Sequence, residues 1–372
     1  MKIGMVCYPT YGGSGIVATE LGKYLADKGH QVHFISSSQP ERINTLSQNL
    51  YFHDVSSSSY PLFKHPPYVL ALASKMVDVV IHEKLEILHV HYAIPHAAAA
   101  YMAKQILNSK GIKIPVVTTL HGTDITLVGK DKNYEPVVEF SINESDAVTA
   151  VSEDLIKETN HHFEIKKDIV HIPNFIDLSR FSKQPKEHFR LAICPEGERL
   201  LIHVSNFRKV KRTDAVIRVF NEVRKKIPSK LLMLGDGPER SNCEQLCREL
   251  QACDDIRFLG KTGAVEEVLS VSDLFLLTSE KESFGLAALE AMACQVPVCT
   301  TNAGGLSELN IDKVTGRVCR LGNEDEMVEA CIEILIDDNV LAQYKKNARQ
   351  RAELYTIDNV VPKYLDLYKS LI

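Results

Sequence analysis

The stretch S-E-K-E-S-F-G-L-A-A-L-E-A-M-A, residues 279–293, follows the apolar run Leu274–Leu277 and consists of strong helix formers from about Gly285. It predicts a buried strand, a turn and a helix, with the turn at the carboxyl end of the strand. Ligands bind at that end in open α/β sheets. The N–H groups of Phe284, Gly285 and Leu286 would be unpaired at the helix start, where the helix dipole favours an anion.

Two acids flank this turn, Glu282 before the helix and Glu290 within it. Because a carboxylate cannot bind a phosphate, we interpret both as acceptors for sugar hydroxyls on either side of an anion. The alternative is that Glu282 is a first-turn acid that stabilises the helix dipole, and that Glu290 is a solvated surface residue. The helix is apolar nearly all round, which predicts burial, and a buried Glu290 needs a partner.

Length and composition predict a protein with two domains. The chain has 372 residues, 45% hydrophobic and 24% charged, and its formal charge of −5 argues against nucleic acid as the main partner. No apolar run reaches the roughly 18 residues of a membrane span, so we expect no stable membrane insertion. The sequence begins directly in a strand pattern, which predicts a cytoplasmic protein. The nine cysteines are interpreted as buried thiols, and the sequence is compatible with a homo-oligomer.

Strand and helix patterns alternate through both halves of the chain. The predicted strands are 2–7, 31–35, 87–91, 116–120 and 147–151 in the first half, and 200–204, 231–234, 256–259, 274–277 and 296–300 in the second. The predicted helices include 13–28, 68–82 and 95–107. This pattern predicts an α/β protein with two Rossmann-like, doubly wound parallel-sheet domains facing a cleft. We expect one domain at 1–175, with the helix 356–372 packing back on it, and the other at 176–355.

A glycine loop follows the first predicted strand. Gly13, Gly15 and Ala18 fit the dinucleotide fingerprint G-x-G-x-x-A. That fingerprint also needs an acid after the second strand, where this chain has Ser36-Ser37-Ser38. A nicotinamide cofactor is therefore disfavoured. We interpret the loop as a close backbone approach to another ligand, with a plain tight turn as the alternative.

Two predicted strands of the first half end in histidine-bearing loops, H-V-H-Y at 89–92 and L-H-G-T-D at 120–124. His121 follows an apolar strand and precedes Gly at the predicted ligand-binding edge, so it is a candidate catalytic residue. His89 is interpreted as structural, because strand alternation points it and His91 the same way into the sheet.

Arg208, Lys209, Lys211 and Arg212 form the densest basic cluster of the chain. We interpret Lys209 and Arg212 as solvated. Arg208 and Lys211 are placed where a diphosphate at the start of the 285–293 helix would need counter-charge. Each such contact contributes roughly 1.5–3 kcal/mol.

Taken together in this order, six motifs resemble the retaining glycosyltransferases of family 4, which have the two-domain GT-B fold. They are the glycine loop, Leu120-His121, I-P-N-F-I-D at 172–177, the lysine of K-R-T-D at 211–214, G-D-G-P-E at 235–239 and E-x7-E at 282–290. The resemblance implies that Glu290 holds the ribose of a nucleotide diphosphate sugar, Glu282 meets the sugar and Lys211 grips the diphosphate. This chain has Asn206 where the family usually has a phosphate-binding arginine, and Arg208 is the candidate substitute.

Three further motifs, at 7–15, 89–96 and 120–126, are similar to family members that transfer N-acetylglucosamine from UDP-GlcNAc to L-malate, the first step of bacillithiol synthesis. The resemblance thus implies UDP-GlcNAc as donor substrate, L-malate as acceptor and no cofactor. The predicted catalytic residues are His121, Glu282 and Lys211. The predicted donor-binding residues are Gly13, Ser14, Asn206, Arg208, Lys211, Glu282, Ser283, Phe284, Gly285, Leu286 and Glu290. Malate carries two carboxylates that need cations or hydrogen-bond donors, and the predicted acceptor-binding residues are Ser14, Lys64, Tyr92 and Thr123.

No metal is expected in the reaction. The chain lacks the D-x-D motif of the other main glycosyltransferase fold, and Lys211 with the helix start would take the metal's place. Double displacement would need a carboxylate nucleophile, for which Asp124 is the candidate. The family is generally thought to react on one face of the sugar, and we favour that route. Alternatives are another small or lipid acceptor, a UDP-GlcNAc 2-epimerase-like enzyme, or a nucleotide-sugar sensor.

Overall fold

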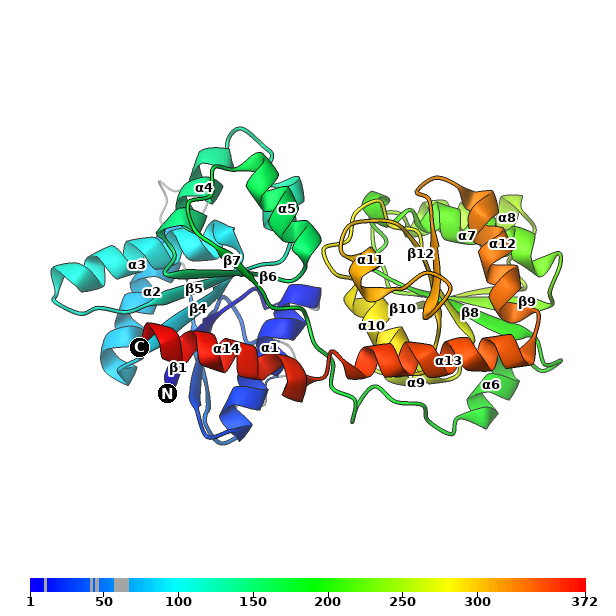
Figure 1. Cartoon of the computed structure of the whole chain (residues 1–372), viewed down its shortest axis with the longest axis horizontal. Helices are drawn as coiled ribbons and strands as arrows, with labels where there is room; N and C mark the ends of the chain where they lie inside the picture. The colour runs from blue at the N-terminus through cyan, green and yellow to red at the C-terminus, as the bar shows by residue number, and fades with distance from the viewer. Residues whose placement is uncertain (10–11, 41–42, 44–46, 57–66) are drawn as a thin grey trace. The chain divides into compact units, whose positions relative to one another are not determined.

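The computed structural model describes residues 1–9, 12–40, 43, 47–56 and 67–372. The chain divides into two compact units, Met1–Phe175 with Ile357–Ile372, and Ile176–Thr356. Each unit is a parallel sheet with helices packed on its faces (Figure 1). No helix in these described ranges is long and apolar enough to cross a membrane.

The first unit is built on a seven-stranded parallel sheet of order β3-β2-β1-β4-β5-β6-β7. Its strands are β1 Lys2–Val6, β2 Gln31–Ser36, β3 Leu50–Asp54, β4 Ile87–His91, β5 Val116–Leu120, β6 Ala147–Ala150 and β7 Ile169–His171. Its helices are α1 Gly13–Asp27, α2 Tyr68–Glu83, α3 Ala98–Ser109, α4 Glu135–Glu144, α5 Glu153–His162 and α14 Ile357–Leu371, with helical turns at Ala93–Ala97 and Thr123–Leu127. Strands β1, β4 and β5 lie centrally and are almost fully buried, including the polar side chains of His89 and His91 in β4 and of Thr118 and Thr119 in β5.

The second unit repeats this plan on a six-stranded parallel sheet of order β10-β9-β8-β11-β12-β13. Its strands are β8 Arg199–Val204, β9 Ser229–Leu234, β10 Ile256–Gly260, β11 Leu274–Leu277, β12 Val298–Thr301 and β13 Gly316–Cys319. Its helices are α6 Glu187–Ile193, α7 Thr213–Arg224, α8 Arg240–Glu249, α9 Val265–Ser270, α10 Leu286–Ala293, α11 Leu306–Leu309, α12 Glu324–Leu335 and α13 Asp338–Glu353, with a short turn at Lys209–Lys211. Phe220, Met233 and Leu276 are central to its core.

Both sheets reverse their strand order at one point, between β1 and β4 in the first and between β8 and β11 in the second. Ligands of doubly wound sheets bind outside the carboxyl ends of the strands at such a reversal. The loops at these two points are those after β1 and β4, and those after β8 and β11. The stretch 279–293 thus lies at the binding edge of the second sheet.

Three strands, β3, β7 and β13, were not predicted from the sequence. All three lie at sheet edges, where one side of the strand has no neighbour, so their sequences L-Y-F-H-D, I-V-H and G-R-V-C lack a continuous apolar run. The helix predicted at 95–107 was wrong at its start. Residues Ala93–Ala97 form a separate helical turn that is interrupted at Ile94 by extended angles (φ −127°, ψ 140°), and the regular helix begins at Ala98.

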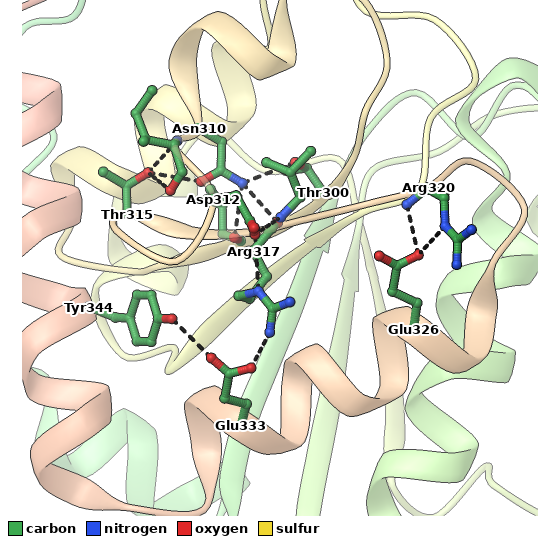
Figure 2. Close-up of polar contacts among 12 residues, drawn as sticks. Thr300, Asn310, Asp312, Thr315, Arg317, Arg320, Glu326, Glu333 and Tyr344 are labelled. Atoms are coloured by element: carbon green, nitrogen blue, oxygen red, sulfur yellow. Dashed lines mark hydrogen bonds and ion pairs between the residues drawn. The ribbon is translucent and has the colours of Figure 1, made fainter.

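A buried amide fastens the edge of the second sheet (Figure 2). The Asn310 side chain donates to the carbonyl oxygens of Val298 (3.2 Å) and Arg317 (3.0 Å), and to the Thr300 hydroxyl (3.0 Å). It thereby ties β12 to β13. The loop between β12 and α11 in turn supports the stretch 279–293, because the Gly305 N–H donates to the carbonyl oxygen of Glu282 at 2.9 Å.

Candidate active site

The turn between β11 and α10 has unused backbone donors. Helix α10 begins at Leu286, one residue later than predicted, because Gly285 adopts left-handed angles (φ 94°, ψ 52°) before it. Within the described part of the chain, no residue accepts a hydrogen bond from the N–H groups of Phe284, Gly285 or Leu286. These groups and the positive end of the helix dipole form a site suited to an anion. The Phe284 side chain is buried and packs edge-on against Tyr355, so only its backbone is available to a ligand.

An ion pair lies beside this turn. The Lys211 ammonium pairs with the Glu282 carboxylate, and the Ser279 hydroxyl donates to the same carboxylate oxygen at 2.9 Å. The Thr278 hydroxyl donates to the carbonyl oxygen of Lys211 at 3.0 Å, which holds the loop after β8 against the end of β11. The structure therefore brings together the predicted phosphate-binding lysine and the predicted sugar-binding acid.

Glu290 lies on α10 and is only 8% exposed. This burial agrees with the apolar character of the helix on the faces around it. The carboxylate interacts with other groups of the structure and so is not isolated.

The loop after β8 carries the two remaining donor-site candidates, Asn206 and Arg208, and both are exposed. Gly235 and Gly237 of G-D-G-P-E lie in close contact with the backbone of this loop. A Cβ at Gly235 would lie 1.8 Å from the Ser205 carbonyl oxygen, and one at Gly237 would lie 2.2 Å from that of Asn206. These glycines therefore set the backbone position of the loop. Arg208 forms no ion pair with any residue that the structure describes, so its guanidinium is available to an anion.

The loops after β1, β4 and β5 carry the hydroxyl groups predicted to bind the acceptor. Tyr92 donates to the Ser14 hydroxyl at 2.7 Å. Burial raises the pKa of Tyr92 to about 12, against its hydrogen bonds with Ser14 and Thr123, which lower it. Three of the four predicted residues thus lie together at the strand reversal of the first sheet, near the exposed Gly13. Lys64 lies outside the described residues.

His121 is part of a stack of buried histidines. Its Nε2 lies 2.8 Å from His91 Nδ1, and His89 contacts the Tyr368 hydroxyl (2.6 Å) and the Thr119 hydroxyl (2.7 Å). Burial lowers the pKa of His121 to about 3 and that of His91 well below its usual value. These rings are therefore neutral at physiological pH. His121 can donate or accept a hydrogen bond, but it cannot supply a positive charge.

Asp124 is almost fully buried, and its carboxylate holds the backbone of two loops. Oδ2 accepts from the Ala93 N–H at 2.9 Å and Oδ1 from the Gly122 N–H at 3.0 Å. Burial raises the pKa of Asp124 to about 6, against these backbone hydrogen bonds that lower it. Because both oxygens are occupied, Asp124 is better suited to positioning the loops than to attacking a sugar.

Two family models match the chain. One, described as Glycosyltransferase Family 4, covers residues 11–180, and the other, Glycosyl transferases group 1, covers residues 184–351. The chain is also 46% identical over 377 aligned positions to N-acetyl-alpha-D-glucosaminyl L-malate synthase of Bacillus anthracis, covering 100% of this chain and 97% of the relative. The chain belongs to glycosyltransferase family 4.

Solved structures show the same fold. The Anabaena protein HepE, in complex with UDP and glucose, has a TM-score of 0.85 at 18% identity, with 100% of both chains covered. Sucrose-phosphate synthase from Thermosynechococcus elongatus has a TM-score of 0.82 at 20% identity, covering 100% of this chain and 99% of that one. The predicted fold class, with two Rossmann-like parallel-sheet domains of the GT-B type, is confirmed.

Sequence reasoning missed two residues of this glycosyltransferase that support the donor-site candidates. Ser279 orients Glu282 through a hydrogen bond. In the sequence, the only indication of this contact is that Ser279 stands three residues before the acid. His203 is buried at the end of β8, where its ring contacts the Leu276 carbonyl oxygen and the Ser205 hydroxyl, each at 2.8 Å. It thereby links the two strands that meet at the strand reversal. Its sequence context, inside an apolar run, resembles that of any core residue.

Proposed function

We propose that this glycosyltransferase transfers N-acetylglucosamine from UDP-GlcNAc to the hydroxyl group of L-malate with retention of configuration, the first step of bacillithiol synthesis. The observation that carries the proposal is the similarity to the B. anthracis L-malate synthase along the whole chain. The Lys211 ammonium and the N–H groups before α10 in the second unit, and the hydroxyl groups of Ser14 and Tyr92 in the first, support it.

The second unit is proposed to hold the donor. The diphosphate would lie at the N–H groups that precede α10, with Lys211 and Arg208 as counter-charges. Glu290 would accept hydrogen bonds from the ribose and Glu282 from the sugar. Ser283, Gly285 and Leu286 would contact the donor through their backbone, as would Asn206 in the loop held by Gly235 and Gly237.

The first unit is proposed to hold the acceptor. Gly13 and the hydroxyls of Ser14, Tyr92 and Thr123 provide hydrogen-bond donors for the two carboxylates of malate. His121 would donate or accept a hydrogen bond at the reacting sugar as a neutral ring. The role of Lys64 in binding the acceptor and the location of the protein in the cytoplasm stay predictions.

The transfer is proposed to occur on one face of the sugar. The bond between the anomeric carbon and the diphosphate oxygen breaks, and UDP leaves with the electron pair. The malate hydroxyl oxygen forms the new bond on the same face, and its proton passes to the departing diphosphate. The engagement of both Asp124 oxygens with backbone N–H groups argues against a covalent intermediate on that residue.

A screen of UDP-GlcNAc against small hydroxy acids tests the acceptor. UDP release is expected to rise with L-malate and to stay near background with acids that lack the hydroxyl. Equal release with every acid would contradict the proposed acceptor. Conversion of the donor without an acceptor would instead support the epimerase alternative.

A further inference from the structure

Three side chains of the first unit bring potential metal-ligand atoms within 4.8 Å of one another. They are His33 of β2, His53 of β3 and Glu83 at the end of α2. Among the described residues, no other group of three or more histidine, cysteine, aspartate or glutamate side chains does this. Neither the sequence motifs nor the proposed reaction accounts for this cluster.

The parallel pairing of β2 and β3 places the two histidines on one face of the sheet. Ile35 pairs with His53 and His33 with Tyr51, and side chains two residues apart share a face. The His33 ring stacks against the rings of Tyr51 and His53, with centroid separations of 4.6 and 5.2 Å. Ile35 packs in one core cluster with residues of α2, so this helix covers the same face and delivers Glu83 to it.

The geometry suits a cation that takes nitrogen and oxygen ligands. His33 Nδ1 lies 3.0 Å from His53 Nε2. Ligand atoms around a tetrahedral Zn²⁺ lie about 3.3–3.5 Å apart, given metal–ligand bonds of about 2.0–2.2 Å. The Glu83 carboxylate lies within 4.8 Å of the two imidazole nitrogens, and rotation of its flexible side chain can bring it to the ion. Two imidazoles and one carboxylate favour zinc over magnesium or calcium, which prefer oxygen ligands alone.

A hydrogen bond between the two histidines would explain only part of the arrangement. The Glu83 carboxylate forms no salt bridge with any residue that the structure describes. A bound cation would use this negative charge to offset its own and would join all three side chains.

We propose that His33, His53 and Glu83 bind one Zn²⁺ ion that fastens the edge strand β3 to β2 and α2. The site is separate from the reaction. His33 and His53 lie on β2 and on the edge strand β3, whereas Ser14 and Tyr92 follow β1 and β4, the two strands of the reversal. The ion is therefore expected to stabilise the first unit without taking part in sugar transfer.

Titration of the chelator-dialysed full-length protein with Co²⁺ tests the site. We expect one saturable equivalent per chain, with the visible absorption of a tetrahedral complex, and displacement by Zn²⁺. His53→Ala and Glu83→Gln are each expected to weaken binding by roughly tenfold or more. His82→Ala is the matched control, because this neighbouring imidazole is 74% exposed and pairs with Asp78 instead. Zn²⁺ should raise the Tm of the wild type and the control, but not that of the two ligand variants.

The site would be refuted if the wild type bound no saturable Co²⁺, or if both ligand variants bound it as tightly as the His82→Ala control. Glu83→Gln preserves the side-chain shape, so the Co²⁺ affinity of this variant tests the site even if His53→Ala fails to fold. UDP release should be equal with and without Zn²⁺. A failure of this proposal therefore leaves the proposed function untouched.

Discussion

The Lys211 ammonium pairs with the Glu282 carboxylate, and the Ser279 hydroxyl donates to the same carboxylate oxygen at 2.9 Å. Both side chains are proposed to contact the donor. A diphosphate would compete with Glu282 for Lys211, because it offers more negative charge to the same cation. Donor binding would then release the Glu282 carboxylate toward the sugar.

Glu282→Ala is expected to lower kcat by about 10²–10³-fold, with a smaller effect on the KM for UDP-GlcNAc. In the proposed site the acid would compete with the diphosphate for Lys211, so its removal should leave UDP binding unchanged or make it tighter. Steady-state kinetics and UDP calorimetry measure the two effects. A variant with wild-type kcat would show that Glu282 does not act on the sugar.

Glu290→Ala is expected to weaken donor binding by roughly 10- to 100-fold, the loss of a charge-assisted hydrogen bond of about 1.5–3 kcal/mol. The effect should appear in UDP binding as well, because the ribose belongs to UDP. Glu280→Ala is the control, since this acid of the same loop is exposed. Equal affinities of the two variants for UDP would refute the ribose contact.

Lys211→Ala is expected to lower kcat/KM by at least about 10²-fold, because in the proposed metal-free reaction no metal would help to neutralise the diphosphate. Wild-type initial rates should be the same in EDTA. Lys209→Ala, which removes an exposed lysine of the same turn, should remain close to wild type. Loss of activity in EDTA that magnesium or manganese restores would overturn the metal-free reaction.

Tyr92→Phe is expected to raise the KM for L-malate roughly tenfold, equivalent to about 1.4 kcal/mol, with little change in the KM for UDP-GlcNAc. The hydroxyl removed is the one that contacts Ser14 at the strand reversal of the first sheet. Tyr134→Phe removes the hydroxyl of an exposed tyrosine and serves as the control. An unchanged malate dependence would refute this assignment.

Much of the fold was predictable because central parallel strands are buried on both faces and carry continuous apolar runs. Strand β11, with the sequence L-F-L-L, matches its predicted bounds for this reason, and β4 and β5 match theirs although histidine or threonine interrupts their apolar runs. The edge strands β3, β7 and β13 have no such signal. Neither does His203, whose role depends on strands β8 and β11 being neighbours across 73 residues of the chain.

The sequence predicted which loops carry the donor-site candidates, but it did not predict which contacts these residues make. Patterning placed Lys211 and Glu282 each at the carboxyl end of a strand, but it gave no indication that the two strands are neighbours or that the two side chains pair. The cluster of His33, His53 and Glu83 was missed altogether. Its members come from an unpredicted edge strand, a buried strand and a helix end, and only the fold brings them together.

The most direct test of the account is UDP release from UDP-GlcNAc with and without L-malate, together with the anomeric configuration of the product. We predict release that depends on malate and yields one α-linked N-acetylglucosaminyl malate for each UDP. Release that malate does not stimulate, or a β-linked product, would contradict the account.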